Sequence, residues 1–148
     1  MIYAAGKVQT IMTEYTHKVQ YYETDKMGFV HHSNYIRWFE EARLDYMDQA
    51  GYPYKNMEDI GLFCPVLAAE CTYKKSVCFG DTVKIYTKLT EYGNVRHKFS
   101  YLVVDAETGE ERAEGSTEHC LLDVHGHVTS LKRKDPQLFE KFAAMTEE

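Results

Sequence analysis

The sequence predicts a domain of the α+β class, in which one long amphipathic helix is followed by a series of antiparallel strands. Two observations indicate this class. Apolar side chains recur every three or four residues between Asn34 and Gly51, whereas the segments after Gly61 alternate in polarity and are rich in β-branched and aromatic residues. Because short turns separate those later segments, we expect neighbouring strands to run antiparallel.

The helix after residue 33 has the clearest pattern. Its apolar stripe consists of Tyr35, Phe39, Ala42, Tyr46 and Ala50, with Ile36, Trp38 and Met47 at its margins. At about 100° per residue this stripe covers roughly half of the helix circumference, which suits a helix wrapped by a curved sheet. Asn34 is the predicted N-cap and Gly51 the residue that ends the helix. Arg43 falls inside the stripe, so we expect a carboxylate or carbonyl partner for its charge.

The remaining elements are expected to be five strands and a C-terminal helix. The expected strands cover residues 15–22, 62–76, 82–92, 95–105 and 111–124. A loop is expected at 53–61, and the last helix should begin at Asp135 with Pro136 at its first position. We interpret residues 1–148 as a single domain, with 1–13 as a loose N-terminal arm.

Composition narrows the class of protein. The chain has 148 residues, of which 44% are hydrophobic and 27% charged, as in an ordinary globular domain rather than a disordered segment. A net charge of −6 argues against a nucleic-acid partner. The first residues show neither a targeting signal nor a membrane span, so we expect a cytoplasmic protein.

The four cysteines and the histidine-rich turn offer possible metal ligands. None of Cys64, Cys71, Cys78 and Cys120 forms a C-x-x-C pair, which favours free thiols over a disulfide framework or a zinc site. The pair His125 and His127 lies in a tight turn without a third ligand nearby in the sequence. We therefore predict no metal.

The segment before the helix carries the candidate chemistry. It delivers one carboxylate, Asp25, and two imidazoles, His31 and His32, just before a helix N-terminus. Such a terminus supplies unpaired N–H groups that can stabilise an oxyanion, and a nearby carboxylate can act as a nucleophile or as a base. The residues alone leave a second interpretation open, in which Asp25 only bonds within a turn and both histidines are exposed.

Residues 21–35 also resemble a known family. They follow the pattern aromatic-x-[Glu/Asp]-Thr-Asp-x-x-Gly-x-Val-x-His-x-x-Tyr, and the helix that follows carries Glu-x-Ala-Arg at 40–43. This pattern is similar to that of the 4-hydroxybenzoyl-CoA thioesterase and YbgC group of hotdog-fold proteins. The resemblance extends from about Tyr15 to Lys134 and includes Pro65, the pair Lys74 and Lys75, and a Gly-Asp turn at 80–81.

The resemblance implies a fold, an activity and site residues. It implies the hotdog fold, a long central helix wrapped by a curved antiparallel sheet, and hydrolysis of a fatty-acyl- or aroyl-CoA without a cofactor. Asp25 matches the catalytic aspartate and His32 a histidine frequent in the YbgC branch, whose backbone N–H is the expected oxyanion donor. His31 or His32 would then position water or the thiolate leaving group. A homodimer or homotetramer with the site at the dimer interface is also implied.

Several roles stay open on the sequence alone. Candidate groups for the phosphates of CoA are Lys74, Lys75, Lys132, Arg133 and Lys134, although a solvated surface explains any one of them better. Glu40 and Glu41 on the helix are interpreted as supporting or structural. A non-catalytic acyl-CoA-binding or scaffold protein is the main alternative. A hydratase on the same fold is less favoured, because its usual spacing of a histidine and an acid is absent from the sequence.

Overall fold

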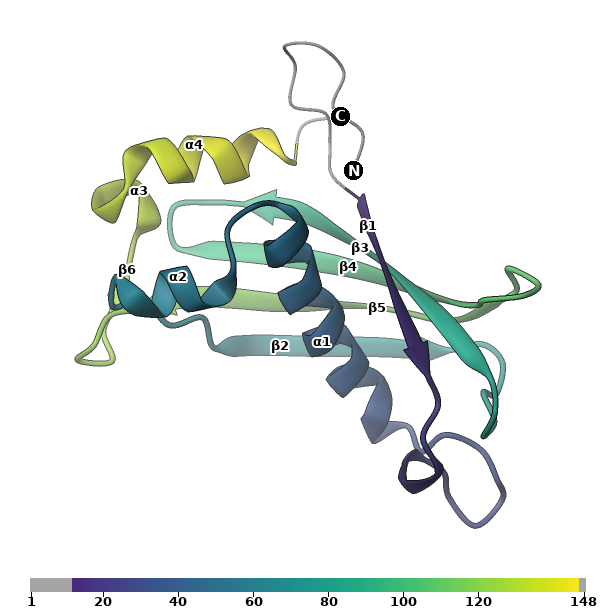
Figure 1. Cartoon of the computed structure of the whole chain (residues 1–148). Coiled ribbons are helices and arrows are strands. Elements are labelled where there is room, and N and C mark those ends of the chain that lie inside the picture. The colour runs from purple at the N-terminus through teal and green to yellow at the C-terminus, as the bar shows by residue number, and fades with distance from the viewer. Residues whose placement is uncertain (1–11, 147–148) are drawn as a thin grey trace, which may run out of the picture.

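One antiparallel sheet and one long helix form the core of the fold (Figure 1). The computed structural model describes residues 12–146. The strands are β1 (Met12–Lys18), β2 (Val66–Tyr73), β3 (Thr82–Tyr92), β4 (Arg96–Asp105), β5 (Glu111–Leu122) and β6 (Val128–Thr129). Five of them follow the order β1-β3-β4-β5-β2, and β6 pairs with β5. Every pairing between these strands is antiparallel.

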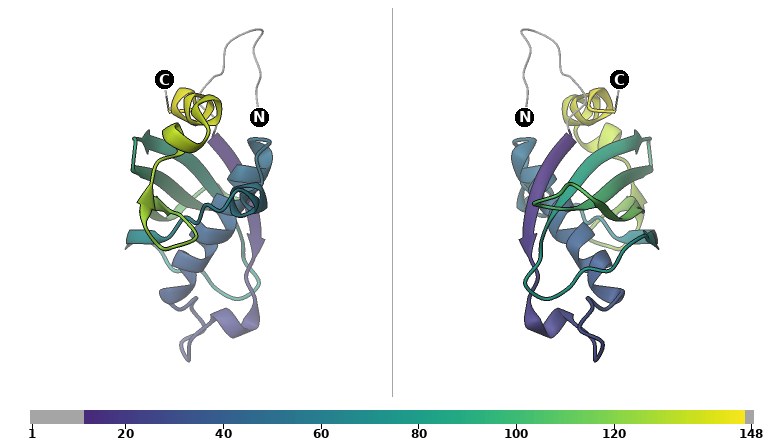
Figure 2. Two further views of the ribbon diagram at one scale, coloured as in Figure 1. Left: turned by 90° about the vertical axis from the view of Figure 1, so that its left-hand side faces the viewer. Right: turned by 90° about the vertical axis from the view of Figure 1, so that its right-hand side faces the viewer.

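The long helix α1 (Ser33–Gln49) packs its apolar stripe against this sheet. Trp38, Phe39, Ala42 and Tyr46 have no exposed surface. The Phe39 ring stacks on Tyr101 of β4, with 4.4 Å between ring centroids. The predicted stripe is therefore buried, and the predicted α+β class and hotdog arrangement are confirmed, as the side views of Figure 2 illustrate.

A glycine on β5 makes room for this packing. A Cβ atom at Gly115 would lie 2.6 Å from the Phe39 ring and would collide with the backbone oxygen of Glu70 on the neighbouring strand. Because neither the ring nor the strand can withdraw without opening the core, any larger residue is excluded here.

Four short helical elements accompany α1. They are η1 (Tyr21–Glu23), α2 (Tyr54–Asp59), α3 (Leu131–Lys134) and α4 (Pro136–Ala144). The predicted start of the last helix is confirmed, since Pro136 is its first residue and the Asp135 side chain accepts a hydrogen bond from Leu138 N–H. The sequence did not predict η1, α2, α3 or β6, because elements of two to six residues are too short to show a period. Among the described residues, no helix is long and apolar enough to span a membrane.

The predicted boundaries of the first strand and of α1 are wrong by a few residues. The strand covers Met12–Lys18 rather than 15–22, so two residues of the expected arm belong to the sheet. Residues 1–11 of that arm lie outside the described chain. The helix begins at Ser33 with His32 as its N-cap, whereas Asn34 was the predicted N-cap. The Asn34 amide instead donates to the backbone oxygen of Glu23, which holds the preceding loop against the helix.

The strand observed within residues 62–76 is shorter than expected and is not paired with the next strand in the sequence. It covers Val66–Tyr73 and pairs with β5 rather than with β3, its successor in the sequence. The residues before it make only an isolated bridge between Phe63 and Leu122. Each predicted turn at 93–94 and 108–109 joins two paired strands, but the connection 74–81 runs from one edge of the sheet to β3. As a result β2 is an edge strand.

Candidate active site

An open pocket of about 340 Å³ lies beside the N-terminus of α1. Its wall is formed by Asp25, Phe29, Val30, His32, Tyr35, Tyr73, Lys74, Lys75 and Ser76. The loop before α1, the start of α1 and the end of β2 with the residues after it thus all contribute to this wall. Four residues singled out in the sequence, Asp25, His32, Lys74 and Lys75, are brought together here although they are some fifty positions apart.

The loop that carries Asp25 is closed by its own backbone. Asp25 N–H donates to Phe29 O at 2.7 Å, and Gly28 adopts a φ of 83° that favours glycine. The Oδ1 atom of Asp25 accepts hydrogen bonds from the N–H groups of Met27, at 2.8 Å, and Phe29, at 3.3 Å. Among residues 12–146, Oδ2 has no such partner. The exposed carboxylate is therefore oriented through one oxygen and open at the other.

The two histidines differ in their surroundings. His32 lines the pocket, and its backbone oxygen accepts a hydrogen bond from Tyr73 OH at 3.1 Å. His31 instead lies with its Nδ1 atom 2.8 Å from Ser33 Oγ. The two rings are 4.1 Å apart between centroids, and both side chains are exposed. Of the two imidazoles, the structure thus brings that of His32 into the pocket with Asp25.

The backbone N–H groups at the start of α1 are almost all occupied. His31 N–H donates to Glu23 O at 2.8 Å, Ser33 N–H to His31 Nδ1 at 3.3 Å, and Asn34 N–H to His31 O at 3.0 Å. Within the described part of the chain, His32 N–H has no acceptor. One N–H at a helix N-terminus is thus left for a ligand, at the residue that lines the pocket.

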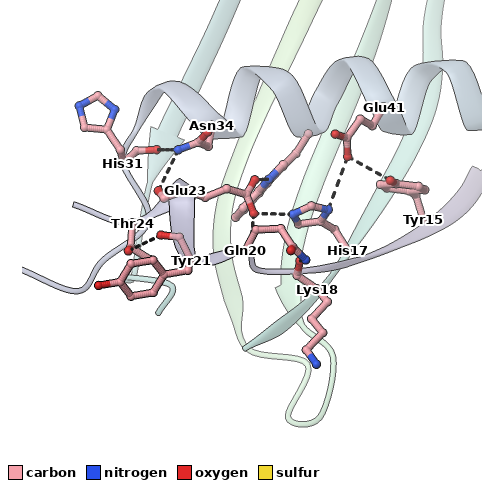
Figure 3. Close-up of polar contacts among 11 residues, drawn as sticks. Tyr15, His17, Lys18, Gln20, Tyr21, Glu23, Thr24, His31, Asn34 and Glu41 are labelled. Atoms are coloured by element: carbon pink, nitrogen blue, oxygen red, sulfur yellow. Dashed lines mark hydrogen bonds and ion pairs between the residues drawn. The ribbon is translucent and has the colours of Figure 1, made fainter. Parts of the chain in front are cut away.

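Sequence reasoning missed Glu23 as a structural residue. Its carboxylate is buried and accepts hydrogen bonds from Gln20 N–H and from the indole of Trp38, and it also contacts His17 (Figure 3). Burial raises the pKa of the Glu23 carboxyl, but these hydrogen bonds outweigh burial and the pKa lies below its ordinary value. The acidic position within the family pattern was visible in the sequence, whereas its burial was not.

The basic residues predicted to contact the phosphates of CoA lie in two separate parts of the molecule. Lys74 forms ion pairs with Glu111 at 2.7 Å and Glu114 at 3.4 Å, and Lys75 pairs with Glu110 at 2.6 Å. Both lysines line the pocket. Arg133 and Lys134 lie on α3, which is at the opposite end of the molecule from the Asp25 loop in every view (Figures 1 and 2). Within one chain these two residues do not meet the pocket.

A second group of polar and ionisable side chains lies inside the fold. We call Arg43, Cys64, His97 and His119 the Arg43 cluster. The Arg43 guanidinium contacts both ring nitrogens of His119, and Cys64 Sγ is 3.1 Å from His97 Nε2. The prediction of a carboxylate or carbonyl partner for Arg43 is therefore wrong, because the partner in the structure is the imidazole of His119. Burial and then the charge of Arg43 lower the pKa of His97 to about 4 and that of His119 to about 3.

Possible metal ligands occur in this cluster. One nitrogen or sulfur atom from each of Cys64, His97 and His119 lies within 4.8 Å of the others. A metal ion there would sit beside the Arg43 cation and would have to displace the contacts of His119 with Arg43 and Thr117. We therefore interpret the cluster as packing rather than as a metal site.

The turn with His125 and His127 is exposed and is explained by its own backbone hydrogen bonds. Both backbone N–H groups donate to one carboxylate oxygen, Asp123 Oδ1, at 2.9 Å. These bonds are those of a tight turn, and the two rings lie 6.3 Å apart between centroids.

Comparisons with known proteins agree with this fold. Residues 19–147 match the Thioesterase-like superfamily. A putative esterase of Aquifex aeolicus is 38% identical over 120 residues, which are 81% of this chain and 91% of that protein. A putative acyl-CoA thioesterase, YneP, of Bacillus subtilis is 31% identical and covers 72% of this chain and 76% of its own length. The crystal structure of a DHNA-CoA thioesterase from Staphylococcus aureus superposes with a TM-score of 0.84 at 35% identity, covering 88% of each chain.

The chain therefore belongs to the thioesterase-like superfamily of hotdog-fold proteins. The names of YneP and of the Staphylococcus aureus protein are those of thioesterases, and this protein is a thioester hydrolase.

Proposed function

We propose that this enzyme hydrolyses the thioester of a fatty-acyl- or aroyl-CoA at the pocket beside α1, with Asp25 as the catalytic carboxylate. The observation that supports this most strongly is the combination of Asp25 and the unoccupied His32 N–H on one pocket wall. A thioester carbonyl that accepts a hydrogen bond from His32 N–H would lie at the positive end of the helix dipole.

The chemistry can start from Asp25 in two ways. Its free oxygen either attacks the carbonyl carbon directly or takes a proton from a water molecule that attacks instead. In both routes the carbonyl oxygen gains negative charge, which His32 N–H stabilises. The C–S bond then breaks, and CoA leaves as a thiolate that takes up a proton. When water attacks, the acyl group leaves at once as the free acid. When Asp25 attacks, the acyl group is first bonded to its carboxylate as a mixed anhydride, and a water molecule then cleaves this bond to release the acid and restore the carboxylate. His32, or the exposed His31 beside it, positions the water or the leaving thiolate.

Substrate recognition is proposed from the lysines and from the relatives. Lys74 and Lys75 supply positive charge at the pocket, although each is paired with glutamates that CoA phosphates would have to replace as partners. Arg133 and Lys134 reach such a site only if a partner subunit brings them there. Both DHNA-CoA and acyl-CoA appear in the names of the relatives, so aroyl and fatty-acyl groups remain the proposed class.

A dimer through β2 is proposed on the basis of its free edge. Most side chains of this strand are exposed, among them Val66, Leu67 and Tyr73. An apolar edge strand presents unpaired N–H and C=O groups that template pairing with another strand. Pairing two copies at this edge would bring the partner close to Tyr73, which lines the pocket. The acyl group would then lie against the second subunit, in a dimer or in a pair of dimers.

The four cysteines of the sequence are free thiols in the structure. Free thiols and a CoA substrate both fit a reducing cytoplasmic location, which we propose.

A panel of CoA esters tests the function. Fatty-acyl esters of graded length and several benzoyl esters are incubated with the enzyme, and release of the CoA thiol is followed. We expect at least one ester to reach a kcat/KM of about 10⁴ M⁻¹s⁻¹ or more. Tight binding of a CoA ester without turnover by the wild-type enzyme would instead support the acyl-CoA-binding alternative. Sedimentation at micromolar concentration tests the dimer, which a monomer would contradict.

A further inference from the structure

We propose that Glu23 is a positioning residue for catalysis, because its buried side chain holds the peptide that presents His32 N–H to the pocket. This inference rests on the proposed function, since it assigns to Glu23 the alignment of the oxyanion donor. Glu23 itself is 4% exposed and is not among the pocket residues, so it acts through other groups rather than on the substrate.

The Glu23 side chain joins three segments of the chain. Its Oε1 atom lies 2.8 Å from His17 Nε2 on β1 and accepts a hydrogen bond from Gln20 N–H at 2.7 Å. Its Oε2 atom accepts the indole N–H of Trp38 on α1 at 2.6 Å. Because each oxygen has a partner on a different element, the carboxylate locks the end of β1 and the turn after it to the second turn of α1.

The Glu23 backbone transmits this position to the helix start. Its carbonyl oxygen accepts His31 N–H at 2.8 Å. The same oxygen accepts the Asn34 side-chain amide at 2.9 Å, as Figure 3 shows. These two bonds lie on either side of His32, whose own N–H is the unoccupied one. Asp25 follows Glu23 by only two positions. One buried carboxylate thus fixes the relation between the catalytic carboxylate and the oxyanion donor.

This arrangement predicts a specific conflict in the variant Glu23→Gln. A glutamine has one oxygen and one NH₂ group, whereas the donors around Glu23 approach both oxygens. In either orientation the NH₂ group must face the indole N–H of Trp38 or the backbone N–H of Gln20. Two donors facing each other in a buried site push the groups apart, so the segment from Glu23 to Asn34 should shift.

The kinetic test uses Glu23→Gln, with each protein assayed well below its own Tm. We expect kcat to fall by about tenfold to a hundredfold with KM changed by less than about threefold, because a small misplacement affects the transition state more than ground-state binding. The matched control is Glu41→Gln. Glu41 is the other carboxylate near His17, at 3.5 Å, and it also accepts a hydrogen bond from Tyr15, but its side chain forms no hydrogen bond or ion pair with residues 23–34. This control should keep kcat within about twofold of the wild type.

A second pair of variants separates positioning from loss of stability. Trp38 is the single tryptophan of the sequence, and Trp38→Phe removes the indole donor while it keeps an aromatic ring. In the double variant Glu23→Gln/Trp38→Phe the NH₂ group can face the side from which the indole donor has been removed, so the conflict between donors is gone. We therefore expect its kcat to exceed that of Glu23→Gln, although its Tm is equal or lower. A double variant whose kcat falls by the product of the two single losses would show that Glu23 and Trp38 act independently, and would contradict the donor conflict.

An experiment without substrate keeps this inference separate from the proposed function. Hydrogen exchange of the peptide that contains His31 and Asn34 should be faster in Glu23→Gln than in the wild type and in Glu41→Gln. If wild-type protein hydrolyses no CoA ester, the proposed function fails while faster exchange still shows the mechanical link. If Glu23→Gln hydrolyses at the wild-type rate, or exchange in this segment is unchanged, the positioning role is wrong. Should Glu23→Gln fail to fold, wild-type kcat in Trp38→Phe would overturn the inference equally.

Discussion

The pocket beside α1 and the Arg43 cluster contain similar side chains in opposite environments. The pocket has an exposed carboxylate and an exposed imidazole near an unoccupied N–H group. The Arg43 cluster has two imidazoles, a thiol and a guanidinium, and three of these four residues are buried. In the first group a hydrogen-bonding atom is left free, whereas in the second the polar atoms contact one another. Solvent access and unsatisfied donors, rather than residue type, distinguish a site from packing.

The largest expected contrast comes from the variant Asp25→Asn. An asparagine keeps the oxygen that accepts Met27 N–H and Phe29 N–H, so the loop should keep its shape. The amide is a far poorer base and nucleophile than a carboxylate, and we expect kcat to fall by about a hundredfold or more with the unfolding free energy changed by less than about 0.5 kcal/mol. Steady-state kinetics and urea unfolding measure both quantities. Wild-type turnover in this variant would remove Asp25 from the mechanism.

The second-largest effect should be a loss of folding stability at acidic pH, caused by the buried histidines of the Arg43 cluster. The pKa of His97 in the folded protein is about 4, below the value of 6.5 for a free histidine. The unfolded chain therefore binds more protons here between pH 6.5 and 4, so stability is complete above pH 6.5 and decreases as the pH falls towards 4. At pH 5 the cost is about 2 kcal/mol for this residue. Urea unfolding at pH 7.5 and pH 5 measures the difference.

The variant His97→Phe serves as the control for this acid effect. It removes the titrating group but keeps an aromatic ring between Tyr92 and His119. The difference in unfolding free energy between the two pH values should shrink by about the amount assigned to His97. An unchanged pH dependence in this variant would contradict a neutral, buried His97.

A moderate effect is expected from charge reversal at the pocket. In Lys75→Glu the KM for a CoA ester should rise by about threefold to tenfold while kcat changes little, because a phosphate contact binds ground and transition states alike. Lys75 is the candidate with a more exposed side chain, 59% against 34% for Lys74. The comparison variant is Arg133→Glu on α3. A rise in KM only for Arg133→Glu would move the phosphate contact to α3 of a partner subunit.

The smallest effect is expected from Cys64→Ala. Burial raises the pKa of the Cys64 thiol to about 12, so this thiol is protonated and unreactive at neutral pH. We expect kcat within about twofold of the wild type and slow modification of Cys64 by a thiol reagent until the protein unfolds. Mass spectrometry of modified peptides measures the second quantity. A large loss of kcat would make the Arg43 cluster part of the active site and would erase the contrast with the pocket.

Local patterns in the sequence predicted a large part of the fold. The apolar stripe of α1, strands β3 and β4 and the Asp135 cap of α4 all depend on residues within a few positions of one another. Asp25 and His32 were also singled out, by their place before a helix and by the resemblance of residues 21–35 to a family pattern. Their catalytic roles stay predictions that the variants above test.

The tertiary structure alone decided which distant residues meet. Lys74 and Lys75 reach the pocket because β2 pairs with β5 and ends near α1, and the partner of Arg43 is 76 positions away at His119. Glu23 is important for the same reason, since its partner Trp38 belongs to another element. Periodicity and capping act between neighbours along the chain, so a single sequence displays them directly. Strand order, burial and the last free N–H of a helix emerge only after all segments have packed together.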